Sequence, residues 1–515
     1  MFSIPRRACH LLECLIAAIA LLSVLAAGIR ADDARAVDAA GDSDIASPAT
    51  FDLCPNPADQ QASRVRLQLE VGGHLSVAGQ GGVQKLPMSV VADMAYEEQF
   101  LSTGSARRSV RYYERSDAVI KVGKSTLDEE LADDRCLILA RLNDLGERAG
   151  PRITLVSPAG PLTRDQLDLI DIVGSSLVLP DLLPNEPVAI GQSWQHTEQA
   201  IAALVRLEAV SHCDVQSAID RIDGDQASIT LSGVVSGASE GVSTEISLKA
   251  KYRFDLTEHR IREFNLAVEE KRPIGHASPG VDVVAKLNIR IGPLPQPKHL
   301  TETVLAKLPP PFRSTGRDTA TAEATLPEET ATQLCHRLSG GRWQLAHDRR
   351  WYVAADEQRL TILRLIDRGD LVAQCNVRPL SAKSPERHLT LEEFQNDVQF
   401  AFGERMTELV SASQWEDDRG HRVFRVVARG KVEELPIEWR SYLVAHRDGH
   451  RINFTFTVEG PLSDQLGQAD HRLVSSVEYI GPEPSAKETE PSAEKPKPVT
   501  TAAQPKRGRG VRLRR

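Results

Sequence analysis

The chain has 515 residues, of which 41% are hydrophobic and 26% are charged, and its formal net charge is −9. A chain of this length is too long for one hydrophobic core and predicts two or three domains. Both ends of the chain are basic, so the body between them is more acidic than the whole. Because an acidic body repels the phosphate backbone, nucleic acid is an unfavourable partner.

The first 31 residues have the pattern of an export signal. Arg6 and Arg7 precede an apolar stretch at residues 15–27, and small residues follow it. This pattern predicts a signal peptide that is cleaved before Ile29 or Asp32. The alternative is an uncleaved anchor helix, although the stretch is shorter than the roughly 20 residues that span a bilayer. Either interpretation places the body outside the cytoplasm, in a periplasm or secreted.

Strands dominate the next part of the chain. Residues 32–50 are small and acidic, and we expect them to be disordered. Residues 51–292 then show β-type patterns, such as the strict apolar–polar alternation from Val65 to Val71. Asp223-Gly-Asp225 is a hairpin signal between two of these segments. Together the segments predict a large, curved antiparallel β-sheet domain.

One short helix is predicted within this β-rich domain. Thr163 and Gln166 have the spacing of a capping box, and Leu167 begins an apolar face. The acidic residues of the helix, including Asp168 and Asp171, fall outside that face. We expect them to contact water instead of forming a site.

A second domain follows a linker. Residues 293–332 are rich in Pro, Thr and Ala, which is typical of a linker. Residues 333–481 then show a strand pair, a helix with Thr390 and Glu393 as its capping box, an antiparallel meander and a C-terminal helical pattern. The whole chain is therefore predicted to have an α+β fold with two domains.

The order of elements in the second domain, together with the hairpin sequence Gly449–Phe456, resembles the PsbP-like α/β/α sandwich. This resemblance implies an export-associated and mostly non-catalytic domain, and it assigns no binding residue to this chain. The sheet of the first domain is loosely similar to the open β-sheets of LolA-type periplasmic lipid carriers, in architecture only.

The cysteines do not form an obvious framework of disulfides. Five follow the export signal, at positions 54, 136, 213, 335 and 375, and none belongs to a CxxC pair. Export permits disulfides, and Cys335 with Cys375 is the candidate pair because both belong to the second domain. The alternative is that Cys375 is a small buried thiol on a strand.

Residues 482–515 form a tail that we expect to be disordered. Its last ten residues include six cations, which are candidates for binding an anionic surface: Lys506, Arg507, Arg509, Arg512, Arg514 and Arg515. The alternative is that the tail is only a solvated end.

The sequence contains fragments of catalytic and cofactor-binding motifs, but each fragment lacks a required residue. Gly123-Lys-Ser125 lacks the first glycine of a phosphate loop, where Ala118 stands, and Gly191–Gln195 lacks the second glycine of a nucleophile elbow. His421, His446 and His450 lie near predicted turns, where we expect exposed side chains. We therefore predict no catalytic, cofactor or metal residues.

The sequence thus favours a non-enzymatic extracytoplasmic binding or scaffold protein. In this hypothesis the concave sheet of the first domain holds an apolar ligand, and the second domain docks to an envelope protein. The alternative is an extracytoplasmic hydrolase whose catalytic residues meet only in the folded structure.

Overall fold

A computed structural model describes residues 49–55, 61–79, 82–103, 106–143, 152–276, 278–309, 333–382 and 389–481. The predicted export signal, nearly all of the segment 32–50, residues 310–332 of the predicted linker and the basic tail lie outside these ranges. Within them, no helix is both long and apolar enough to cross a bilayer.

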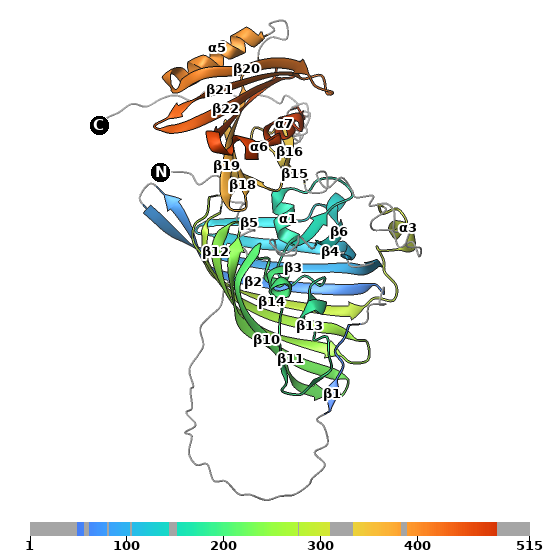
Figure 1. Cartoon of the computed structure of the whole chain (residues 1–515). Helices are drawn as coiled ribbons and strands as arrows, with labels where there is room; N and C mark the ends of the chain where they lie inside the picture. The colour runs from blue at the N-terminus through green and yellow to red at the C-terminus, as the bar shows by residue number, and fades with distance from the viewer. Residues whose placement is uncertain are drawn as a thin grey trace, which may run out of the picture.

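The first body is built on a twelve-stranded sheet in which all paired strands are antiparallel. Its order is β7 (Arg152–Val156), β6 (Leu137–Asn143), β4 (Ala106–Val122), β3 (Gly82–Thr103), β2 (Ser63–Gly79), β14 (Gly280–Pro293), β13 (Arg260–Arg272), β12 (Val242–Asp255), β11 (Gln226–Ser239), β10 (Ala209–Asp223) and β9 (Ser193–Gln195), with β5 (Ser125–Glu130) paired to β4. Figure 1 shows that the sheet is strongly curved. The predicted large antiparallel sheet is confirmed.

The alternation in the sequence decides which face of this sheet is buried. Along β2, Val65, Leu67, Leu69 and Val71 are buried while the residues between them are half-buried or exposed. Side chains of a strand point to opposite faces in turn, so these four enter the core together. The same alternation in β12 and β13 buries one face of the whole sheet and leaves the other to water.

Short elements cover the buried, concave face. They are α1 (Arg164–Ile170), the 3₁₀ helix η3 (Leu179–Leu182), α2 (Glu198–Val205) and a two-stranded sheet of β1 (Thr50–Phe51) and β8 (Val188–Ala189). The predicted α1 is confirmed, with Thr163 and Gln166 forming the capping box. The expectation of a single helix within residues 51–292 was wrong, because α2 is also present, and α3 (Glu302–Leu305) follows in the segment predicted as a linker. Every residue of α2 from Ala200 to Val205 is buried, so its sequence lacks amphipathic periodicity.

The first body extends further than the sequence predicted. Strand β14 runs to Pro293, and Leu300 and Leu308 of the following segment pack with Leu101, Val110 and Leu139. Thus residues 294–308, expected as the beginning of a linker, lie against the sheet.

The second body contains a seven-stranded antiparallel sheet and a smaller three-stranded one. The larger sheet has the order β17 (Trp351–Glu357), β18 (Leu360–Asp367), β19 (Asp370–Leu380), β23 (Arg451–Glu459), β22 (Leu435–Ala445), β21 (Arg422–Val432) and β20 (Met406–Glu416). The smaller sheet has the order β15 (Gln333–Arg337), β16 (Trp343–Asp348) and β24 (Glu478–Tyr479).

Helices lie on both faces of the seven-stranded sheet. Helix α5 (Leu391–Phe402) covers the β20–β21 side of one face, and its predicted capping box of Thr390 and Glu393 is confirmed. The predicted C-terminal helical pattern forms α6 (Ser463–Leu466) and α7 (Ala469–Ser475) on the other face, separated by Gly467 with φ +50°. The remaining short 3₁₀ helices are η2 (Asp133–Arg135), η5 (Gly403–Arg405) and η6 (Gly460–Leu462).

The two bodies contact each other through α1 and the turns of the second body. The amide of Cys335 donates to the carbonyl of Leu162 at 2.8 Å, and the Arg164 guanidinium donates to the carbonyl of Arg349 at 2.6 Å. The same guanidinium lies over the Tyr352 ring, 5.0 Å from its centre. This junction corrects one expectation: Asp168 of α1 is 3% exposed instead of facing water, because the polar face of the helix lies near the second body.

Candidate functional site

Strand β22 of the second body has two chemically different faces. Glu438, Arg440 and Tyr442 point toward α6 and α7, while Trp439 and Ser441 point toward the α5 side. This follows from the two-residue period of a strand. One face carries a closed network of polar contacts, and the other borders a groove.

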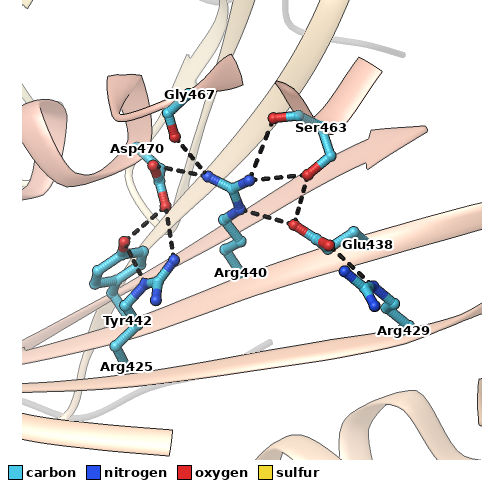
Figure 2. A network of polar contacts seen from close by, with 8 residues as sticks. All are labelled: Arg425, Arg429, Glu438, Arg440, Tyr442, Ser463, Gly467 and Asp470. Carbon is cyan, nitrogen blue, oxygen red and sulfur yellow. Dashed lines mark hydrogen bonds and ion pairs between the residues drawn. The ribbon is translucent and has the colours of Figure 1, made fainter. Parts of the chain in front are cut away.

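The network ties β22 to the C-terminal helices (Figure 2). The Arg440 guanidinium donates to Glu438 at 3.0 Å, to Asp470 at 3.1 Å and to the Gly467 carbonyl at 2.8 Å. Tyr442 donates to the other Asp470 oxygen at 2.6 Å. Burial raises the pKa of Tyr442, and the Asp470 carboxylate raises it further. Because these groups satisfy one another, the network holds α6 and α7 in place and offers no free reactive group.

A groove of about 580 Å³ lies on the opposite face, between α5 and the sheet. Phe394 and Val398 of α5 pack on Phe424, Val426 and Leu443, so the helix covers only the apolar part of that face. A volume of this size lies within the range of small-molecule sites, roughly 300–1,000 Å³. Helix α5, which begins at Leu391 after its capping box, therefore also forms the wall of the groove.

The floor of the groove is polar and regular. Asn376 of β19 lies opposite Thr455 of β23, which lies opposite Ser441 of β22. Two residues further along, Arg378 and Asn453 form the equivalent row. All five side chains line the groove. Amide and hydroxyl groups can both donate and accept hydrogen bonds, so this floor can orient a polar ligand.

The cations at the groove have no acidic partner in contact. Arg378, Arg405 and Arg451 line it, and none forms an ion pair with any residue that the structure describes. Asp397 of α5 is the acidic residue among the lining side chains. The described residues that line the groove therefore carry a net positive charge. No local pattern in the sequence indicated this charge, because the four charged residues come from β19, α5, η5 and β23.

The concave face of the first body, where we expected an apolar ligand, is filled by the protein. The cavity found there has about 10 Å³ and is lined by Tyr96, Arg111 and Tyr113 among others. That is room for about one water molecule. The Arg111 guanidinium donates to buried Glu98 at 2.8 Å, which fastens β3 and β4 to each other beneath the covering loop.

Among the described residues of the first body, a serine and a histidine form a contact of the kind that a hydrolase needs. His196 Nε2 lies 2.7 Å from Ser217 Oγ, and Tyr252 donates to the same oxygen at 3.1 Å. However, Ser217 is 1% exposed, and no described carboxylate contacts the second ring nitrogen of His196. Burial lowers the pKa of His196 to about 4. The pair thus lacks both an orienting acid and access to a substrate.

A set of potential metal ligands, Glu97, Glu114 and His299, also comes together in the first body. The Glu97 carboxylate accepts the backbone N–H groups of residues 298, 299 and 300 at 2.7, 2.9 and 2.9 Å. Glu114 accepts from Arg64 at 2.7 Å, and His299 stacks on Tyr112. These contacts fasten the segment after β14 to the sheet, which is a structural role.

The structure also places the residues that the sequence singled out. Cys335 on β15 and Cys375 on β19 are both free thiols, so the predicted disulfide is not formed in the structure. Burial raises the pKa of Cys375. The tail residues from Lys506 to Arg515 lie outside the described residues.

The expectation of exposed turn histidines was wrong for His421. This side chain is 2% exposed and lies 2.9 Å from Asp417. His446 and His450 are half-buried and pack on Tyr479, with ring centres 4.6 and 4.9 Å apart. Strand β24 brings Tyr479 to these turns from a distant part of the sequence, which no local pattern could show.

No family model matches the chain, and no curated protein is similar to it in sequence. Among solved structures, cyanobacterial PsbP from Synechocystis covers 29% of this chain and 92% of its own, with 16% identity and a TM-score of 0.24. The Ran-binding protein Mog1p of Saccharomyces cerevisiae covers 29% of this chain and 96% of its own, with 10% identity and a TM-score of 0.24. A Pseudomonas aeruginosa protein of unknown function covers 28% and 94%, with 11% identity and a TM-score of 0.20.

These matches are partial and concern the fold alone. The looser similarity of the first body to LolA-type proteins stays a prediction.

Proposed function

We propose that this chain is a non-enzymatic extracytoplasmic binding protein whose ligand occupies the groove beside α5. The observation that carries this proposal is the combination of about 580 Å³ of space, a floor of Asn and Thr side chains, and an apolar wall. A concave site with mostly apolar walls and a few placed polar groups is typical of small-molecule binding. The first body then serves as a rigid platform, since its concave face is filled.

The extracytoplasmic part of the proposal rests on the N-terminal sequence, in which Arg6 and Arg7 precede an apolar stretch. A binding role without catalysis is supported by the chemistry of the groove. Among the residues that the structure describes, no histidine or cysteine lines it, and its acidic side chain, Asp397, is exposed. General acid–base or nucleophilic catalysis needs such groups in mutual contact.

The test is to identify what the protein carries when it is purified from its native source. Mature protein is denatured, and the released small molecules are identified by mass spectrometry. The same is done with a Thr455→Trp variant, in which the indole fills the middle of the groove floor. We expect a compound in near-stoichiometric amount from the wild type and its loss from the variant. Equal recovery from both proteins would contradict the proposal.

A further inference from the structure

We infer that the groove is selective for amphiphilic anions, small molecules with a carboxylate, sulfonate or phosphate head and an apolar body. This inference rests on the proposed function and names the ligand class of the same groove. It is carried by a pair of guanidinium groups at one end of the groove, which one carboxylate compensates only in part, and by apolar side chains along the wall of the groove.

The guanidinium pair comes from neighbouring strands. Arg378 of β19 lies opposite Asn453, and Arg451 of β23 lies opposite Leu380, so the two arginines are diagonal neighbours on one face. The Arg451 guanidinium donates to the carbonyl of Ser381 at 2.8 Å, while its Nε is buried without a hydrogen-bond partner. Two positive charges on diagonal neighbours repel each other, and an anion bound between or beside them would offset this repulsion.

The nearby acid compensates this pair only in part. Burial lowers the pKa of Arg451, and the Asp397 carboxylate partly opposes that effect. Asp397 does not come within ion-pair distance of Arg378 or Arg451. Two guanidinium groups and one carboxylate, counted among the described residues, leave one positive charge at this end. An anionic head that accepts hydrogen bonds from Arg378 would neutralise it, and charge-assisted hydrogen bonds of this kind are short and strong.

The apolar body of the ligand has a place along the rest of the groove. At the other end, Phe402 of α5 stacks on Trp439 of β22, with ring centres 4.4 Å apart and planes 18° from parallel. Thr457 lies opposite Trp439, and Asn453 lies opposite Leu443. These rows are four residues apart along β23, which is about 13 Å at roughly 3.3 Å per residue. A ligand of that length can reach from the arginines to the aromatic pair.

Two fluorescent probes with nearly the same body separate the charge from the apolar contact. 8-Anilinonaphthalene-1-sulfonate carries an anionic head, and N-phenyl-1-naphthylamine is its neutral counterpart. Both are titrated into the mature full-length protein at low salt. We expect the sulfonate to bind about tenfold more tightly, a difference of roughly 1.4 kcal/mol. Equal affinity for the two probes would overturn the inference.

Charge variants give opposite expectations for the same probe. Arg378→Gln should weaken the binding of the sulfonate about tenfold, and Asp397→Asn should strengthen it severalfold, while both leave the neutral probe unchanged. Both residues are exposed, so these variants should fold. Arg359→Gln, an exposed residue of the second body between β17 and β18 that does not line the groove, is the matched control and should change nothing. If the Arg378→Gln variant prefers the sulfonate over the neutral probe as strongly as the wild type does, the inference is contradicted.

Blocking the groove distinguishes this inference from the proposed function. Thr455→Trp should abolish the binding of both probes, and Asn376→Trp is a second blocking variant in case the first perturbs folding, as judged by far-ultraviolet circular dichroism. If blocking removes both probes but the sulfonate has no advantage, the groove binds ligands and only the anion selectivity is wrong. If blocking removes neither probe, the groove itself is not the site and both proposals fall.

Discussion

Arg440 on β22 and Asp470 on α7 form a buried ion pair at 3.1 Å, with the two side chains 10% and 1% exposed. The pair fixes α7 against the seven-stranded sheet, because Arg440 also donates to carbonyl oxygens in the turns around α6. Buried ion pairs of this kind stabilise a fold only while every partner is present, since removal of one leaves an uncompensated charge.

Asp470→Asn should therefore destabilise the second body by about 3–5 kcal/mol. Urea unfolding followed by tryptophan fluorescence measures this, because Trp343, Trp351, Trp415 and Trp439 all belong to the second body. Arg350→Ala is the control in the same body, since its ion pair with Asp348 is 43% and 41% exposed and should contribute at most about 1 kcal/mol. A change below about 1 kcal/mol for Asp470→Asn would show that the network is not needed for stability.

The turn between β11 and β12 of the first body also touches the turn between β18 and β19 of the second body, and this contact depends on two glycines. A Cβ atom added to Gly241 would come within 1.8 Å of the Cα atom of Gly369, a distance at which the backbones must move apart. Gly241→Ala should therefore separate the β11–β12 turn from the β18–β19 turn and increase the radius of gyration measured by small-angle X-ray scattering. Gly224→Ala has a similar positive φ but open space around it, so it separates local strain from the loss of the contact. Identical scattering of both variants would show that the contact does not set the arrangement.

Glu270 at the end of β13 should make stability depend on pH. Burial raises its pKa to about 7, although Arg272 at 3.6 Å opposes this effect. In the unfolded chain the carboxyl titrates near its ordinary pKa of 4.5, so between about pH 4.5 and 7 the unfolded state loses a proton that the native state keeps. The free energy of unfolding then falls as pH rises through this window.

Glu270→Gln should remove this dependence. We expect the variant to gain about 2–3 kcal/mol relative to the wild type between pH 5 and pH 8, measured by urea unfolding at the two values. Glu269→Gln, its half-buried neighbour on the strand, is the control and should follow the wild type. A wild-type pH profile in Glu270→Gln would rule out this carboxyl as the cause.

Export of the chain is a prediction from its first 31 residues. N-terminal sequencing of protein from the native envelope fraction should give a start at Ile29 or Asp32. Intact Met1 in the membrane fraction would support an anchor helix, and intact Met1 in the cytosol would contradict export.

The basic tail should give the protein weak, salt-sensitive affinity for anionic surfaces. Each cation near such a surface contributes on the order of 1 kcal/mol, and a Debye length of about 8 Å limits this attraction at physiological salt. Full-length protein should sediment with anionic vesicles at low salt, while a chain ending at residue 505 should not. Equal sedimentation of the two chains would show that Lys506–Arg515 is not a binding element.

The sequence by itself determined the local structure of this protein. Alternation from Val65 to Val71 predicted a strand with one buried face, and Thr163 and Thr390 with their capping partners predicted the starts of α1 and α5. These features depend only on residues within one helical turn or a few positions of a strand, so the local sequence pattern is enough to predict them.

The tertiary structure decided where a ligand can bind. Helix α2 was missed because the folded chain buries every residue from Ala200 to Val205. Asp168 of α1 was expected to be solvated because its neighbours in the second body are far away in sequence. The groove depends on the antiparallel register that sets Arg378 beside Asn453 and on how far α5 extends over the sheet. Register and helix placement are set by the packing of distant side chains, and no local pattern records them.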